Sequence, residues 1–211
     1  MTVCREHLST DRHENTKKNE LRPHVRQAWV IPPEANADFV AAMEDILEVY
    51  RRPHDSDFPV VCMDEQPIQL LGEVRTRIPA EPGQPERYDY EYRRNGSVAG
   101  FMFVEPLGCH REMRISERRT SEDWALEIER LLEEKYPDAR KIILVCYNLN
   151  THKIGSLYAT FDPEKALCLS KRLEIHYTPK HGSWLNIAEI ELSVFTSQCL
   201  GERRIADIER V

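Results

Sequence analysis

The chain has 211 residues, of which 41% are hydrophobic, and a formal net charge of −7 at pH 7. This length accommodates one domain of about 150 residues with an appendage, or one larger domain, and the apolar content is sufficient for a packed core. The acidic balance excludes nucleic-acid binding through bulk charge alone. It leaves room for a focused basic groove around an acidic metal site, or for a basic domain that is missing from this chain.

Neither a membrane nor an oxidising compartment is indicated. No run approaches the roughly 18 to 20 apolar residues that a membrane helix needs, and the N-terminus lacks an apolar signal core. The six cysteines are scattered without a Cys-x-x-Cys pair, which argues against a disulfide or zinc framework. We therefore expect a cytoplasmic chain that does not contact membranes.

Residues 1 to about 30 are polar and charged, and they contain no pattern of a complete helical domain. This segment is interpreted as a linker or as the tail of another module. From residue 33 to 52, Pro33 is suited to the first turn of a helix, and one apolar helical face follows. That face consists of Phe39, Met43, Ile46, Leu47 and Tyr50. A loop over 51–57 ends this segment. The helix and the loop together lead into a core that begins near residue 58.

Two short apolar runs form the centre of the predicted core. Val60–Met63 and Ile142–Cys146 are rich in β-branched residues, which is typical of strands that are buried on both faces. The first run stops at Asp64, and the second stops at polar residues. Open α/β folds place their chemistry at the ends of such strands. We therefore expect Asp64 at the end of a strand that neighbours the strand ending at Tyr147.

The sequence between the two runs predicts an antiparallel meander and a helix. Proline and glycine make 79–85 a loop, and Asn95-Gly96 is a strong signal for a tight hairpin turn. Strands are expected over 98–104 and 111–116. Thr120 and Asp123 then form a capping box that opens a helix.

Helices and strands alternate after the second buried run. We expect helices over about 153–161 and 163–172, a strand over 173–177, and a last helix with Ser183 as its N-cap. A meander followed by alternating helices and strands predicts an α/β fold, with a mixed sheet and helices on its faces.

Asp64 and Glu189 are the first candidates for chemistry, because carboxylates on separate rigid elements can converge on a divalent cation. Magnesium prefers oxygen ligands and uses only one or two carboxylates, with water and substrate phosphate as the others. The alternative is that Asp64 starts a turn and Glu189 is a solvated helix residue. His152 can bind phosphate, shuttle protons or cap the next helix. Asn186 can orient Glu189 from one helical turn away, or it can be an ordinary polar residue of the first turn.

Three blocks of sequence carry a resemblance to a known family. They are Val61-Cys-Met-Asp-Glu65, Asn148-Leu-Asn-Thr-His152 and Tyr177-Thr-Pro-Lys-His-Gly-Ser-Trp-Leu-Asn-Ile-Ala-Glu189. In this order they resemble the signature blocks of bacterial insertion-sequence transposases of the mariner superfamily, and the segments 82–96 and 18–23 resemble the same group. The resemblance covers roughly residues 16 to 205. It implies an RNase H-like core whose DDE triad holds two Mg²⁺ or Mn²⁺ ions, hydrolyses DNA at the ends of the element and joins them to a target.

Carried over by position, the first Asp of the triad is Asp64 and the Glu is Glu189. The second Asp falls on Tyr147, and Asn148, His152 and Asn186 are expected to support the site. A phenol is neutral at pH 7, so it supplies one weak oxygen where the metal site needs a charged one. The resemblance therefore implies an impaired endonuclease, with metal held weakly by Asp64 and Glu189.

The same resemblance implies domain limits and partners. Residues 1–30 correspond to the remnant or linker after a missing helix-turn-helix region, residues 31–57 to a helix and loop leading into the core, and residues 58–211 to a catalytic domain that is shortened at its C-terminus. The implied partners are the DNA of transposon ends and target, and a second copy or a full-length transposase. The alternatives are a non-catalytic DNA- or transposase-binding remnant and a functionless pseudogene fragment.

Overall fold

The structure is a computed structural model, which describes residues 37–201 and 203–211. The expectations for residues 1–30 and for Pro33 lie outside the described residues. The main elements are, in chain order, α2 (Ala37–Arg51), β1 (Val60–Glu73), β2 (Tyr92–Glu105), β3 (His110–Ser116), α3 (Ser121–Arg130), β4 (Ile142–Tyr147), α4 (Ile154–Thr160), α5 (Pro163–Lys171), β5 (Leu173–Thr178) and α6 (Ile187–Val194). Short π-helical segments extend α3 over Leu131–Lys135 and α6 over Phe195–Leu200.

Five strands form one mixed sheet in the order β3-β2-β1-β4-β5. The pairs β3–β2 and β2–β1 are antiparallel, and the pairs β1–β4 and β4–β5 are parallel. The parallel half consists of strands joined by helices, and the antiparallel half is the meander that the sequence predicted. The expected α/β fold with a mixed sheet is therefore confirmed.

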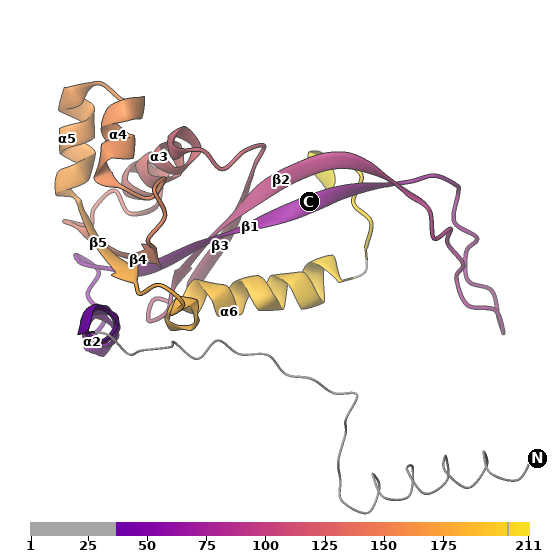
Figure 1. Ribbon diagram of the computed structural model, residues 1–211, viewed down its shortest axis with the longest axis horizontal. Helices are drawn as coiled ribbons and strands as arrows, with labels where there is room; N and C mark the ends of the chain where they lie inside the picture. Colours follow the sequence, from indigo (N-terminus) through magenta and orange to yellow (C-terminus); the bar gives the residue numbers. More distant parts are fainter. Residues whose placement is uncertain (1–36, 202) are drawn as a thin grey trace, which may run out of the picture. The chain divides into compact units, whose positions relative to one another are not determined.

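Helices cover both faces of the sheet, with α3, α4 and α5 on one face and α2 and α6 on the other (Figure 1). Side chains alternate between these two layers along each strand. On β1, Val61 and Met63 pack in the core of α3, α4 and α5, whereas Cys62 packs in the core of α2 and α6. On β4, Leu144 packs in the core of α3, α4 and α5, and Val145 packs in the core of α2 and α6. This alternation decides which residues of each strand can meet at a site.

Strand β1 is longer than predicted, since it continues through Asp64 to Glu73. Its pairing with β2 covers the stretch from Cys62 to Glu73, whereas its pairing with β4 covers only Val60–Cys62. Polar side chains do not end a strand whose backbone groups are still bonded to a neighbour. Pro67 is tolerated because only one side of β1 is paired there. The prediction that this strand ends at Asp64 is therefore wrong.

The pair Asn95 and Gly96 lies inside β2, so the hairpin turn predicted there is wrong. Gln69 pairs with Ser97 and Leu71 with Arg94. Two residues of β2 thus lie opposite one residue of β1, which is the arrangement of a β-bulge. Gly96 has a φ of +104°. Bulges and tight turns both use positive φ, for which glycine is suited, and this explains why the same dipeptide can form either.

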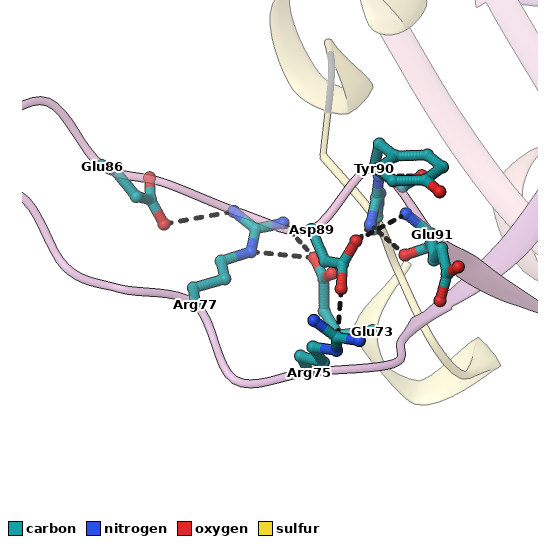
Figure 2. Close-up of polar contacts among 8 residues, drawn as sticks. Glu73, Arg75, Arg77, Glu86, Asp89, Tyr90 and Glu91 are labelled. Carbon is teal, nitrogen blue, oxygen red and sulfur yellow. Dashed lines mark hydrogen bonds and ion pairs between the residues drawn. The ribbon is translucent and has the colours of Figure 1, made fainter.

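The connection between β1 and β2 is a long arm over 74–91, and it contains the loop predicted over 79–85. Isolated β-bridges join Ile78 to Arg87 and Glu81 to Gln84, which places the turn between the last two. Figure 2 shows the ion pairs at the base of this arm: Arg77 with Glu73 and Glu86, and Arg75 with Asp89. Ion pairs with such exposed partners contribute little stability individually, so they orient the arm rather than fold it.

The start of one helix was predicted correctly and the start of another was not. Thr120 Oγ1 accepts a hydrogen bond from the Asp123 amide at 3.2 Å, and the Asp123 carboxylate accepts one from the Thr120 amide at 2.7 Å, which confirms the capping box of α3. Ser183 instead begins a short 3₁₀ turn, and Asn186 is the N-cap of α6. None of the helices in the described ranges is long and apolar enough to cross a membrane.

Candidate active site

Asp64 and Tyr147 lie at the same level of the sheet on neighbouring parallel strands. Asp64 is two residues beyond Cys62, the last residue of β1 that pairs with β4. Tyr147 ends β4 and is two residues beyond Val145, the partner of Cys62. Because Cys62 and Val145 belong to the core beneath α2 and α6, alternation directs Asp64 and Tyr147 to that same face. The predicted adjacency of the two strands is confirmed.

Glu189 lies in the first turn of α6, on this face of the sheet. The helix is fixed there by Asn186, a buried residue whose side chain has two backbone partners. Its Nδ2 donates to the carbonyl oxygen of Met63 at 2.9 Å, and its Oδ1 accepts from the amide of Ala188 at 3.2 Å. Asn186 therefore joins the start of α6 to the residue before Asp64 on β1, and it acts on Glu189 through the backbone.

The surroundings of Asp64 disfavour the charged form of its carboxylate. Burial raises the pKa of Asp64 above its usual value, and the negative charge of Glu189 raises it further. The amide of Glu65, which donates to Asp64 Oδ1 at 2.8 Å, opposes this rise. Glu189 is exposed, and its Oε1 accepts from Ser183 Oγ at 3.3 Å. A cation next to Asp64 would stabilise the charged form of its carboxylate, which burial and the charge of Glu189 disfavour.

The donors on this face fit one divalent cation better than two. Asp64 and Glu189 could supply two carboxylate ligands to one ion, and water with substrate oxygens could complete an octahedral shell. Within residues 37–201 and 203–211, no group of three or more His, Cys, Asp or Glu side chains is placed to share a metal ion. The side chain at this level of the neighbouring strand β4 is that of Tyr147, a phenol rather than a carboxylate.

The opposite face of the sheet carries a buried pair that the sequence analysis missed. His152 Nε2 lies 2.8 Å from Glu65 Oε1, and the two side chains are 1% and 3% exposed. His152 Nδ1 lies 3.0 Å from the carbonyl oxygen of Tyr147. A carbonyl only accepts, so Nδ1 must carry a proton, and a second proton must lie between Nε2 and the carboxylate. Glu65 directly follows Asp64, so a carboxylate within a buried strand was the available signal.

His152 connects several strands behind the candidate site. Its ring stacks on Trp124 of α3, with centroids 5.8 Å apart and planes inclined by 25°. Its carbonyl oxygen accepts from the hydroxyl of Tyr177 on β5 at 2.6 Å. Burial raises the pKa of Tyr177 to about 12, so that this hydroxyl remains a donor. His152 thus links β1, β4 and β5 from the interior, whereas Asn148 is exposed just after β4.

Residues 59–211 match the family described as DDE superfamily endonuclease, and the chain belongs to that family. Among solved structures it is similar to the Mos1 mariner paired end complex with Mn, with a TM-score of 0.57 and 18% identity over 94% of this chain and 60% of that chain. It is also similar to the Mos1 transposase paired-end complex with left transposon end, with a TM-score of 0.57 and 17% identity over 94% of this chain and 59% of that chain. The expected RNase H-like fold is thereby confirmed.

The chain spans about three fifths of the length of these transposases. A third similar structure is the Mos1 paired end complex with Mg, at a TM-score of 0.54 and 17% identity, over 94% of this chain and 59% of that chain. No match was found among the curated proteins.

Proposed function

We propose that this chain is the catalytic domain of a DDE transposase, in which Asp64 and Glu189 hold a divalent metal ion for the cleavage and transfer of DNA strands. The observation that carries the proposal is the approach of these two carboxylates from β1 and α6 on one face of the sheet, where the charge of Glu189 raises the pKa of Asp64. Membership of the endonuclease family supports it. The related Mos1 structures include a complex with a transposon end and complexes with Mn and Mg.

Each residue of the site has a distinct role in this proposal. Asp64 and Glu189 bind Mg²⁺ or Mn²⁺ and compensate its charge. Asn186 fixes α6 to β1 so that the two carboxylates keep their separation. His152 holds the end of β4 through the carbonyl oxygen of Tyr147. When bound, metal ions of this kind activate the attacking oxygen and stabilise the leaving oxygen at the scissile phosphate.

Tyr147 is proposed to impair this site. Three carboxylates would compensate three of the four positive charges on two divalent ions, whereas Asp64 and Glu189 alone compensate two. The neutral phenol cannot replace the missing charge, and hard cations favour charged oxygen. The chain should therefore hold one ion weakly. Without the second ion, the barrier to strand cleavage should rise by roughly several kcal/mol. Since each ~1.4 kcal/mol added to the barrier slows the reaction tenfold, strand cleavage should be close to background.

The test compares the unmodified chain with Tyr147→Asp. Titration calorimetry with Mg²⁺ or Mn²⁺ should show one weak site in the unmodified chain, and tighter binding with a second ion in the variant. Nicking of supercoiled DNA should be detectable only with Tyr147→Asp. Adding Asp64→Ala to that variant should abolish both nicking and metal binding. If the unmodified chain binds two ions and nicks DNA in a manner that requires Asp64, then Tyr147 does not impair the site. If Tyr147→Asp binds no metal, the proposed site is wrong.

The domain limits and partners are part of the same proposal. Residues 58–211 form the catalytic domain of a bacterial insertion-sequence transposase in the cytoplasm, residues 31–57 are a helix and loop that lead into it, and residues 1–30 are a remnant or linker. Its partner is the DNA of element ends and target, and the proposal allows a second copy or a full-length transposase as a further partner. The neutral Tyr147 favours one alternative, a non-catalytic domain that binds DNA or a transposase. Restored nicking by Tyr147→Asp would favour lost catalysis over this alternative.

A further inference from the structure

The loop between β5 and α6 exposes a tryptophan beside the candidate site. The side chain of Trp184 is 63% exposed. It lies in the 3₁₀ turn Ser183–Leu185, which directly precedes the N-cap of α6. The preceding residue, Ser183, donates its hydroxyl hydrogen bond to Glu189. Trp184 is therefore adjacent in the chain to a residue that contacts one of the two candidate metal ligands.

The backbone that carries this exposed ring is firmly anchored. Leu185 is buried in the core formed with α2, and its carbonyl oxygen accepts from Tyr50 Oη at 2.7 Å. The amide of Leu185 donates to Gly182 O at 3.0 Å, and the amide of Gly182 donates to Pro179 O at 2.8 Å. A Cβ on Gly182 would lie 2.6 Å from Pro179 Cγ, so the turn is tightly packed. The loop is thus rigid, and the outward direction of Trp184 is not the result of a loose segment.

Positive charge accompanies the ring. Lys180 lies in the same loop and is exposed. An exposed aromatic ring on an anchored loop that also carries a lysine matches the composition of sites that bind nucleic-acid strands, in which bases stack on aromatic rings and cations contact phosphates. Stacking requires an open base face, which an internal base pair of a duplex does not offer.

We propose that Trp184 is a stacking platform for an unpaired nucleobase next to the phosphate that is cleaved, with Lys180 contacting the backbone of the same strand. This inference rests on the proposed function, because it assigns the DNA strand to the face that carries Asp64 and Glu189. Base stacking is tolerant of sequence, so the platform favours frayed or single-stranded ends without selecting a particular base.

The test measures DNA binding in EDTA, so that metal binding and cleavage do not enter. Fluorescence anisotropy at low salt compares a labelled duplex that carries a short single-stranded overhang with the same duplex made blunt. Trp184→Ala should weaken overhang binding by about 5- to 100-fold, and Trp184→Phe should retain most of it. Blunt-duplex binding should change much less. Tyr158→Ala is the matched control, because Tyr158 is 45% exposed on α4, on the other face of the sheet, and its loss should change neither affinity.

A second measurement detects the stacking itself. In a Trp29→Phe background, Trp184 is the exposed tryptophan, because Trp124 is buried. The overhang substrate should quench its fluorescence, and Trp184→Phe should remove that quenching. Circular dichroism would verify that all variants fold.

The outcomes separate the platform from the proposed function. The platform proposal is overturned if Trp184→Ala leaves both affinities unchanged, or if it weakens the binding of overhang and blunt DNA equally. Unchanged affinities are also the result expected if Trp184 binds a protein partner instead of DNA. If the platform fails while Tyr147→Asp still nicks DNA, the proposed function stands. If the unmodified chain binds no DNA in any form and Tyr147→Asp binds no metal, both are wrong.

Discussion

Removing the Glu65 carboxylate should destabilise the domain more than removing an exposed carboxylate. The side chains of Glu65 and His152 are almost completely buried, and Glu65 Oε1 lies 2.8 Å from His152 Nε2 with a hydrogen bond between them. Glu65→Ala leaves His152 Nε2 in an apolar interior without its partner. Breaking a buried pair in this way costs about 3–5 kcal/mol. Domains of this size are stable by only about 5–15 kcal/mol, so the variant should be marginal.

Two further variants isolate the cause. In Glu65→Gln, the amide nitrogen can donate to Nε2 of a neutral His152 in nearly the same space, so the loss should be about 1 kcal/mol. Glu117→Ala removes an exposed carboxylate and should change stability by less than about 0.5 kcal/mol. The unmodified chain and Glu117→Ala should therefore be about equally stable, Glu65→Gln should be less stable, and Glu65→Ala should be the least stable.

The assay is urea unfolding, monitored by circular dichroism and by tryptophan fluorescence. Trp124 reports on this site, because its ring stacks on His152. In thermal unfolding, each kcal/mol of lost stability lowers the melting temperature by about 2–4 °C, so Glu65→Ala should lower it by about 6–20 °C. A loss below about 1 kcal/mol with an unchanged dependence on urea would contradict the reasoning. It would mean that water or a rearranged His152 replaces the carboxylate without cost.

Three other predictions follow from the site and its surroundings. Burial raises the pKa of Asp64 in the folded chain, so the folded state binds this proton more tightly, and stability falls as the pH rises from the ordinary value of 3.8 through the folded value. Asp64→Asn should therefore be more stable than the unmodified chain at pH 7 in EDTA, and thermal melting should show this advantage vanishing below pH 3.8; an advantage that persists there would have another cause. Burial raises the pKa of Cys62 to about 11 and also raises that of Cys146, so in a Cys4→Ser chain a thiol reagent should react before denaturation only with the exposed cysteines Cys109, Cys168 and Cys199. Rapid native labelling of Cys62 or Cys146 would show that this core opens. DNA binding should be weak and strongly dependent on salt, without preference for an end sequence, because few phosphate contacts are expected; a footprint over a defined sequence at physiological salt would refute this.

Local signals in the sequence predicted the elements that depend on local interactions. The run Ile142–Cys146 is a buried strand, and the capping box at Thr120 starts α3, because both features are specified by neighbouring residues. The continuation of β1 beyond Asp64 was not predictable in this way. It depends on pairing with β2, whose partner residues are distant in the chain. The Asn95-Gly96 pair satisfies a bulge as well as a turn, and only the register distinguishes the two.

The candidate site shows the same division. The order of the motifs led to Asp64, Tyr147 and Glu189, and in the structure the charge of Glu189 contributes to the raised pKa of Asp64. The pairing of Glu65 with His152 was missed because the two residues are separated by 87 positions, and no periodicity connects them. The exact cap of α6 was missed because Ser183 and Asn186 are both suitable N-caps by residue type. Packing of Asn186 against the carbonyl oxygen of Met63 decides between them.

Tyr147 is compatible with a stable fold because the position requires no charge for folding. It lies at the half-buried end of β4, and its carbonyl oxygen, rather than its side chain, binds His152. Any residue can supply that carbonyl. A carboxylate at this position would lie beside Asp64, whose pKa is already raised by burial and by Glu189, so a third negative charge would destabilise the domain without metal. The tyrosine side chain at this position avoids that repulsion. The impairment of metal binding proposed for Tyr147 should therefore come without a loss of stability, and Tyr147→Asp should be the less stable of the two proteins in EDTA.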